Sequence, residues 1–325
     1  MKKFFLIFTI MLMILVVGCG SNTTENSNTE ATSEQTSNNE QVENDGKVID
    51  REGKEVTLPE KTDKIISLAP SITETLINLG LGDKLVAVDK YSLEVLEEKG
   101  INDLPIFDIM TPDAENIVAL QPDIIFGTGM SKSDGTDPFA PMVEMGAFVT
   151  VIPTSTSIEG IKEDILYIGK VTKTEKEAQK IVEDYQNQIN DILSKVEKVK
   201  KDKPITVYFE TSPMPNAYTF GQDTFLNDMI NLLGGENIFS DQSGWLPVSE
   251  EQVVAKNPDI ILTNATFLET PAEDIKNRKG WENINAIKND NVFIIDKDSS
   301  SRANENSIVA FQEIAEALYL DLFEN

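Results

Sequence analysis

The sequence predicts an α/β fold in which two lobes are joined by a single long, rigid helix. Short apolar runs alternate with helical patterns in both halves of the chain, which is typical of parallel sheets covered by helices on both faces. Between these halves, the stretch 174–201 contains no Gly or Pro, and its apolar residues recur three or four positions apart. We therefore expect Rossmann-like lobes at 47–171 and 202–325, with the connecting helix at 172–201.

A repeated sequence links the two halves. ENIVALQPDII begins at Glu115, and EQVVAKNPDII begins at Glu251. The flanking sequences differ, so the copies are not a tandem repeat. We expect each copy to occupy the same place in its own lobe, as a short helix that leads into a buried strand.

The N-terminal residues have the pattern of an export signal. Two lysines precede an apolar run at 4–17, which is short for a membrane span. The run closes on a Gly-Cys pair ending at Cys19, the single cysteine of the chain. Residues 19–46 consist mostly of Ser, Thr, Asn, Gln and Glu, which predicts a disordered tether. The sequence thus predicts a signal peptide at 1–18 and a folded body from about Lys47.

The first half of the body contains a hairpin followed by alternating strands and helices. The first helix should begin near Ser71 or Thr73 and end at Gly80. In chain order we expect the hairpin Val48–Pro59, the strand Lys64–Ala69, this helix, the strand Lys84–Asp89, the helix Pro112–Leu120, the strand Asp123–Gly129, a helix within 137–146 and the strand Ala147–Pro153.

The connecting segment has the pattern of an amphipathic helix of about 28 residues, hence roughly 42 Å long. Pro204 ends it. One face is formed by Ile181, Tyr185, Ile189, Ile192 and Val196.

The second half repeats the alternation. Ser249 is the expected cap of a helix whose first turn holds Glu251, and Gly234 ends another helix. In chain order we expect the strand Ile205–Glu210, a helix within 223–233, a helix and strand within 249–264, the strand Asn291–Asp296 and a closing amphipathic helix within 306–323.

Composition excludes several classes of function. A net charge of −27 without a basic stripe argues against nucleic-acid binding. The absence of histidine excludes His-ligated zinc and haem sites and Ser-His or Cys-His catalysis. A single cysteine forms no internal disulfide and no cysteine-rich metal site. We therefore expect neither a metal site nor an intrinsic cofactor.

Taken together, the motifs resemble the substrate-binding lipoproteins of ABC importers for iron-siderophores, haem and vitamin B12. The resemblance rests on the lipobox-like end of the apolar run, KIISLAPSITETLINLG, the two copies ending in Pro-Asp-Ile-Ile, the long helix and FGQDTFLNDMINLLGGENIF, and it covers about 48–322. It implies the helical-backbone metal-chelate receptor fold, with a ligand cleft between the lobes, modest closure and no enzymatic activity.

The resemblance also implies a location and partners. Cys19 would be lipidated after cleavage before it, which anchors the protein to the outer face of the plasma membrane, or to its periplasmic side where an outer membrane exists. The protein would act as a monomer and deliver its ligand to a permease dimer driven by a separate ATPase.

In this family one carboxylate on each lobe pairs with arginines of the two permease subunits. The matching positions are Glu115 and Glu251, with Glu74 and Glu250 as alternatives. The other interpretation is that Glu115 and Glu251 are acids of a first helical turn that face the positive end of the helix dipole.

Ligand-binding side chains are expected in loops that follow strands, at the inter-lobe face. Tyr91 and Trp245 match aromatic pocket positions of the B12-binding branch, and core packing is the alternative for each aromatic candidate. The candidates are Tyr91, Met110, Met130, Tyr218, Phe220, Trp245 and Arg302.

Charge narrows the expected ligand. The chain has three arginines, and only Arg302 lies where the family often places a pocket arginine. Where the family commonly has Gly-Pro-Arg, this chain has Asn304-Glu305-Asn306. Strongly anionic chelates are usually bound by several arginines. A ferric hydroxamate siderophore is therefore favoured, with a corrinoid as the alternative. Haem would need Met110, Met130 or Tyr91 as its axial ligand.

Other function classes stay open. The lack of histidine argues against a zinc or manganese receptor. The chain has neither a Gly-x-Ser-x-Gly elbow nor histidine, the commonest catalytic base, which argues against a surface hydrolase. A tethered adhesin without a small ligand is the remaining alternative.

Overall fold

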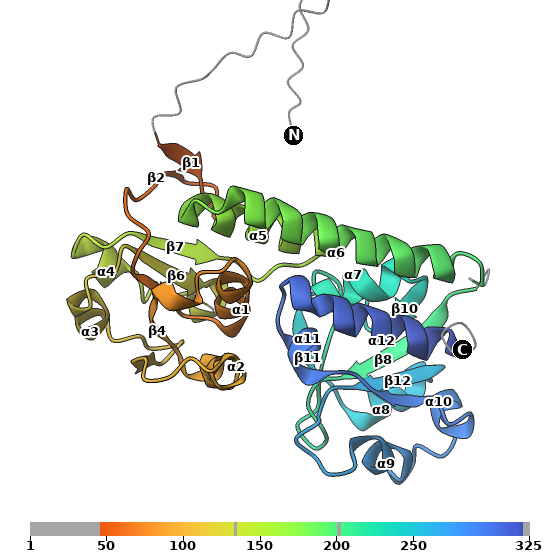
Figure 1. Ribbon diagram of the computed structural model, residues 1–325. Coiled ribbons are helices and arrows are strands. Elements are labelled where there is room, and N and C mark those ends of the chain that lie inside the picture. The colour runs from red at the N-terminus through yellow and green to blue at the C-terminus, as the bar shows by residue number, and fades with distance from the viewer. Residues whose placement is uncertain (1–45, 133–134, 200–202, 321–325) are drawn as a thin grey trace, which may run out of the picture. The chain divides into compact units, whose positions relative to one another are not determined.

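The computed structural model describes residues 46–132, 135–199 and 203–320, which belong to one compact unit spanning 44–325 (Figure 1). The predicted signal peptide, the lipidation of Cys19 and the tether up to Asp45 lie outside the described residues. Within these ranges, no helix combines the length and apolar character needed to cross a membrane.

The N-terminal lobe is built on a five-stranded parallel sheet of order β5-β4-β3-β6-β7. Its strands are β3 Ile65–Ser67, β4 Leu85–Asp89, β5 Ile106–Phe107, β6 Ile124–Thr128 and β7 Val149–Ile152. Its helices are α1 Pro70–Asn78, α2 Leu93–Lys99, α3 Ala114–Ala119 and α4 Ala140–Glu144. Ile66 and Ile125 of adjacent central strands are fully buried, as expected for a sheet covered on both faces.

The predicted hairpin is confirmed as β1 Lys47–Ile49 and β2 Glu55–Thr57, which pair antiparallel. Ion pairs fix it to the lobe. Arg51 Nε donates to Asp164 Oδ1 over 2.6 Å, and Lys132 Nζ donates to Glu52 Oε1 over 2.8 Å.

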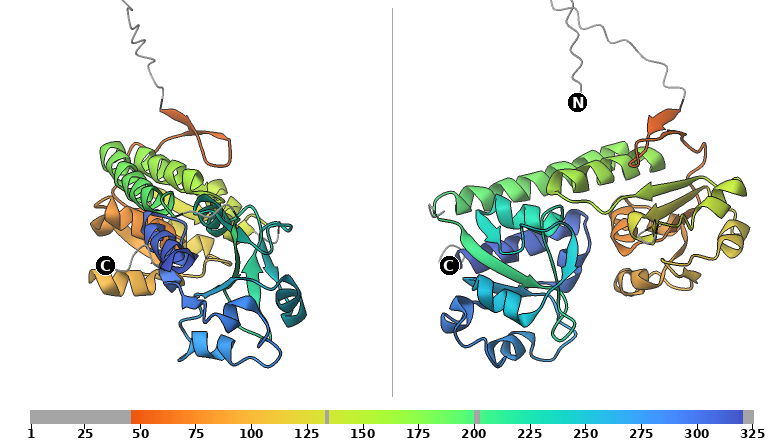
Figure 2. Two further views of the ribbon diagram at one scale, coloured as in Figure 1. Left: turned by 90° about the vertical axis from the view of Figure 1, so that its right-hand side faces the viewer. Right: turned by 180° about the vertical axis from the view of Figure 1, so that it is seen from behind.

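Two helices connect the lobes. α5 Ile158–Thr172 is followed after Lys173, at φ 60°, by α6 Glu175–Val196, and Figure 2 shows them side by side. The predicted long helix is confirmed as α6, but it has 22 residues and ends earlier than expected. Val196 is its last buried residue, and the lysine-rich sequence that follows offers no apolar face for packing.

The C-terminal lobe has a four-stranded parallel sheet of order β10-β8-β12-β13. Its strands are β8 Ile205–Glu210, β10 Gly235–Asn237, β12 Ile260–Thr263 and β13 Val292–Ile294, and a separate antiparallel pair is formed by β9 Tyr218–Phe220 and β11 Trp245–Pro247. The helices are α7 Phe225–Leu232, α8 Glu250–Lys256, α9 Pro271–Lys276, α10 Asn285–Lys288, α11 Lys297–Ser301 and α12 Ile308–Leu318. The fold class predicted from the sequence is confirmed.

The buried face of α6 packs against the C-terminal lobe. The predicted apolar positions are buried, except Ile181, which is partly buried. Tyr185 Oη lies 2.8 Å from Ser307 Oγ, immediately before α12, and α12 runs beside α6 (Figure 1). Helix α6 is therefore packed into the core rather than surrounded by solvent.

The repeated sequence adopts the same backbone in both lobes. Gln121 and Asn257 precede the prolines of the two copies and have left-handed φ values of 51° and 46°, an uncommon conformation for residues with a side chain. Asp123 Oδ2 accepts from the backbone N–H of Lys64 at 3.0 Å, and Asp259 Oδ2 accepts from that of Thr206 at 3.2 Å. Each repeated aspartate thus anchors the start of the neighbouring strand, β3 or β8.

Candidate functional site

A cavity of about 140 Å³ is lined by residues of both lobes. The N-terminal lobe contributes residues that end or follow β3, β6 and β7. The C-terminal lobe contributes the start of α7, β11 and the end of α11. The lining comprises Ala69, Pro70, Ser71, Ile72, Ile109, Thr128, Met130, Ile152, Pro153, Thr154, Ser155, Asp164, Phe225, Trp245, Ser301, Arg302 and Ala303. Residues beyond the carboxyl ends of parallel strands are where α/β proteins usually bind ligands.

The cavity is smaller than the roughly 300–1,000 Å³ of typical small-molecule sites. A chelate would have to extend past it onto neighbouring side chains, or the lobes would have to separate. A larger hollow of about 570 Å³ lies beside Pro204, Asp259 and Asn291, which precede β8, β12 and β13. This position is at the amino ends of the strands, and the hollow adjoins stretches outside the described residues, so we do not assign ligand binding to it.

Five of the predicted ligand contacts are exposed apolar side chains, between 41% and 55% exposed. They are Tyr91, Met110, Met130, Tyr218 and Trp245. Tyr91, Met110 and Met130 follow the carboxyl ends of β4, β5 and β6. Of these five, Met130 and Trp245 line the cavity, whereas Tyr91, Met110 and Tyr218 do not. The exposed apolar surface of these side chains is available to a ligand.

Phe220 does not fit its predicted role. It is fully buried, and its ring lies 5.4 Å from that of Phe209 and 5.6 Å from that of Trp245. The pairing of β9 with β11 places Phe220 opposite Trp245. Phe220 therefore supports the indole of Trp245 instead of contacting a ligand.

The turn before Trp245 depends on two glycines. Gly244 has a φ of 72°, in the left-handed region that favours glycine. A Cβ on Gly221 would lie 2.0 Å from the carbonyl oxygen of Gln242. This close approach of two backbone segments is possible only without a side chain at 221, and it holds Trp245 at the cavity.

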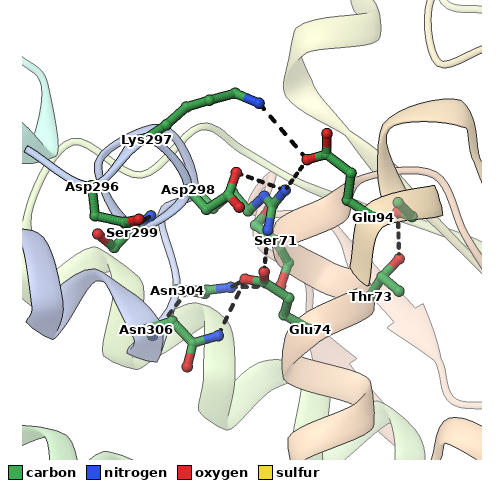
Figure 3. Close-up of polar contacts among 12 residues, drawn as sticks. Ser71, Thr73, Glu74, Glu94, Asp296, Lys297, Asp298, Ser299, Asn304 and Asn306 are labelled. Atoms are coloured by element: carbon green, nitrogen blue, oxygen red, sulfur yellow. Dashed lines mark hydrogen bonds and ion pairs between the residues drawn. The ribbon is translucent and has the colours of Figure 1, made fainter. Parts of the chain in front are cut away.

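Arg302 lines the cavity, but it is enclosed by carboxylates. Figure 3 shows how those of Glu74, Glu94 and Asp298 gather in this region. Its Nη1 contacts Glu74 Oε1 of α1, and its Nη2 lies 2.9 Å from Asp298 Oδ1 and 3.7 Å from Glu94 Oε2. Lys297 Nζ also lies 3.7 Å from Glu94 Oε2. The predicted pocket arginine is therefore present, but its charge is already paired across the lobes.

The segment before α12 makes further hydrogen bonds to α1. Asn304 Nδ2 donates to Glu74 Oε2 over 2.5 Å and to the carbonyl of Ser71 over 3.2 Å. Glu305 accepts from Thr75 Oγ1 at 2.9 Å and from Asn78 Nδ2 at 2.8 Å. The pKa of Glu305 is raised by burial, with a smaller contribution from the charge of Glu74. This departure from the family's Gly-Pro-Arg places a second carboxylate at the contact between the lobes.

A chain of buried hydroxyl groups positions α1. Thr73 Oγ1 donates to Ser67 Oγ over 2.8 Å and lies 2.9 Å from Ser92 Oγ, which donates to Asp89 Oδ2 over 2.5 Å. Burial raises the pKa of Asp89, and the bond from Ser92 opposes this shift. The helix that carries Glu74 therefore has a fixed position on the sheet.

The sequence does not predict several of the residues that line the cavity. They include Ser71 at the start of α1, Thr128 at the end of β6 and Ser155 shortly after β7. Ser155 Oγ donates to the buried Asp164, whose pKa is raised by burial. Their place shortly after predicted strands is the sequence signal, and it applies to small polar residues as well as to large apolar ones. Phe267, 68% exposed after β12, was also missed, although it does not line the cavity.

The two predicted docking acids occupy equivalent places in the two lobes. Glu115 is in the first turn of α3, capped by Asp113, and Glu251 is in the first turn of α8, capped by Ser249. Both side chains are exposed, and neither is ion-paired with a described lysine or arginine. The backbone N–H of Glu251 lowers the pKa of its own carboxyl. Their role in docking stays a prediction.

Among the described residues, no group of three or more acidic, cysteine or histidine side chains could hold a metal ion.

Comparison with known proteins identifies the family. A model of the periplasmic binding protein family matches residues 65–299. The chain is 32% identical over 280 residues to an uncharacterized ABC transporter substrate-binding lipoprotein, YvrC, of Bacillus subtilis (strain 168), covering 85% of this chain and 86% of that protein.

Solved structures agree. A possible iron-binding, periplasmic solute-binding protein from Staphylococcus epidermidis superposes with a TM-score of 0.69 at 30% identity, covering 80% of this chain and 100% of that one. A periplasmic vitamin B12 binding protein of Vibrio cholerae superposes with a TM-score of 0.66 at 26% identity, covering 81% and 98%. The resemblance inferred from the motifs is thus confirmed, and the chain belongs to the periplasmic binding protein family.

Proposed function

We propose that the chain is the extracytoplasmic substrate-binding lipoprotein of an ABC importer and captures a near-neutral metal chelate, most specifically a ferric hydroxamate siderophore. The observation that carries this proposal is the set of exposed apolar side chains, led by Met130 and Trp245, beside a cavity lined by both lobes. Apolar surface with few convergent polar groups is typical of small-molecule sites. Binding, rather than catalysis, is the chemistry that such a set supports.

The pairing of the arginines supports a near-neutral ligand. Arg51 is bound to Asp164 and Glu163, each at 2.6 Å. Arg278 forms two bonds of 2.5 and 2.6 Å with the buried Glu210. Neither guanidinium lines the cavity. A strongly anionic chelate would therefore lack the convergent arginines that it usually needs.

A corrinoid is the second candidate ligand. The vitamin B12 binding relative has the same fold. Tyr91 and Trp245, whose positions match aromatic pocket positions of that branch, are both about half exposed, which supports stacking on a flat macrocycle. The size of the cavity does not distinguish a corrinoid from a siderophore.

Native mass spectrometry of the folded body with a chelate panel tests the proposal. The panel contains a ferric trihydroxamate, cobalamin, haemin and a ferric tricatecholate. We expect a one-to-one complex with the trihydroxamate. A complex with cobalamin alone would favour the corrinoid. The absence of every complex would overturn the proposal and favour the adhesin or hydrolase alternatives.

Delivery would proceed through the two acids of the repeat. In the proposed arrangement, Glu115 and Glu251 each contact one subunit of a permease dimer that works with an ATPase, while Cys19 anchors the monomeric protein to the membrane by lipid. Exposed ion pairs contribute only about 0–1 kcal/mol each, so these acids would set orientation and encounter more than affinity.

Charge reversal tests docking separately from binding. Glu115→Lys with Glu251→Lys should abolish ligand uptake by cells and leave ligand affinity unchanged. The control is Glu175→Lys with Glu177→Lys, which reverses the same number of exposed first-turn charges on α6. Equal uptake loss in the control, or loss of affinity in the first pair, would contradict the assignment.

A further inference from the structure

The arginine of the cavity is almost fully withdrawn from solvent. The side chain of Arg302 is 9% exposed and that of its partner Glu74 is 12% exposed. Glu74 belongs to α1 of one lobe and Arg302 to the segment after α11 of the other, so their ion pair bridges the lobes. The pair lies at the edge of the space where a chelate would bind.

The charges around this pair do not sum to a positive site. Arg302 and Lys297 face the carboxylates of Glu74, Glu94 and Asp298, all within 3.7 Å. Glu305 accepts bonds from Thr75 and Asn78 on the same α1 helix, which adds another acid nearby. A ligand approaching Arg302 therefore meets an acidic cluster.

Glu74 is the member of this cluster that the protein holds most firmly. Besides Arg302, it accepts bonds from Asn304 Nδ2 at 2.5 Å and Asn306 Nδ2 at 3.2 Å. An anionic ligand that bound Nη1 of Arg302 would have to displace Glu74. The displaced carboxylate would then be buried without its cation, which is strongly unfavourable.

We propose that Glu74 is a specificity-determining residue: by holding the guanidinium of Arg302, it makes the cleft reject anionic chelates and select electroneutral or cationic ones. The inference rests on the proposed function, because it concerns which chelates that cleft accepts. Charge pairs of this kind often act by excluding wrong ligands more than by attracting right ones. A ferric trihydroxamate is electroneutral, whereas a ferric tricatecholate carries net negative charge, so the two probe this selection.

The test compares dissociation constants of these two chelates by fluorescence quenching in wild type and in Glu74→Gln. The substitution keeps the size of the side chain and removes its charge. We expect wild type to bind the trihydroxamate more tightly than the tricatecholate. In Glu74→Gln the ratio of the two dissociation constants should fall by about tenfold or more, because the tricatecholate binds more tightly. Adding Arg302→Gln to Glu74→Gln should remove this gain, since the gain depends on the released guanidinium.

Two control variants complete the design. Glu97→Gln, on an exposed site of α2 outside the cluster, should leave the preference unchanged. Glu94→Gln removes a carboxylate that is 63% exposed, and it should shift the preference in the same direction by less. Glu94→Gln becomes the test variant if thermal unfolding shows that Glu74→Gln does not fold.

The outcomes separate the two proposals. Equal affinity of wild type for both chelates, or an unchanged preference in folded Glu74→Gln, would overturn this inference and leave intact the proposal that the chain captures a ferric trihydroxamate. If Glu74→Gln does not fold, an unchanged preference in Glu94→Gln would overturn it. Failure of wild type to bind any chelate would overturn the proposed function and this inference with it.

Discussion

Replacing Gly169 by alanine tests how closely the two connecting helices pack. Gly169 lies in α5, and a Cβ built on it would lie 2.3 Å from the Cβ of Ala178 in α6 and 3.2 Å from the carbonyl oxygen of Thr174. Neither neighbour is the end of a flexible side chain, so α5 and α6 would have to move apart. Since these helices join the lobes, the substitution strains the connection itself.

Two opposing effects set the size of the loss. Alanine gains roughly 0.5–1 kcal/mol over glycine within a helix, whereas overpacking of a close contact costs about 1–3 kcal/mol. We therefore expect Gly169→Ala to lower the free energy of unfolding by roughly 1–2 kcal/mol. The matched control is Gly160→Ala in the same helix, where the nearest atom would be Ser155 Oγ at an ordinary 3.4 Å. The control should be neutral or slightly stabilising.

Urea unfolding followed by circular dichroism measures these differences. Ala178→Gly removes the opposing Cβ, so the double variant Gly169→Ala/Ala178→Gly should be more stable than the sum of the single losses predicts. If Gly169→Ala were as stable as wild type, or if the double variant showed no coupling, the close packing of α5 on α6 would not be the constraint that we describe.

Three other predictions concern single side chains. Arg278→Met should lower the free energy of unfolding in urea by about 3–5 kcal/mol, because it leaves Glu210 buried without its cation. Adding Glu210→Gln should recover much of this loss. An Arg278→Met variant as stable as wild type would contradict the reasoning. Burial raises the pKa of Glu305 above its ordinary 4.5, so the stability tied to its neutral form is complete below about pH 4.5 and is lost as the pH rises through the raised value. Glu305→Gln should thus gain stability relative to wild type from pH 4 to 7, and a constant difference across that range would refute this sign. Ligand binding should quench the half-exposed Trp245 and not the buried Trp281, so undiminished quenching in Trp245→Phe would exclude contact with Trp245.

Local patterns were sufficient for the central elements of both sheets. Strands β3, β6, β8 and β12 are short apolar runs between turn signals, and each was found close to its expected place. The sequence does not predict the antiparallel pair β9–β11, because it joins Phe220 to Trp245 across the intervening helix α7 and strand β10 and depends on contacts that no local pattern encodes. The sequence places the end of α6 too late for a similar reason, since the length of this helix follows from packing rather than from helix propensity.

For the candidate site too, local patterns predict some of the residues and tertiary contacts decide the others. Position after a strand was enough to select Met130 and Trp245, because the carboxyl ends of parallel strands share one edge. The same rule could not separate the exposed Tyr218 from the buried Phe220, two residues later in one strand. Nor could it reveal that Arg302 is paired with Glu74, which lies 228 positions earlier.

The sequence by itself determined the α/β class, the two lobes, the helical connection and the repeated Glu-to-Pro-Asp segments, because these depend on periodicity and on turn residues close together in the chain. Only the tertiary structure decided which aromatic rings face solvent and how much positive charge the cleft retains. Exposure and charge pairing arise from atoms that meet through space, and here the decisive partners, α1 and the segment before α12, come from opposite lobes.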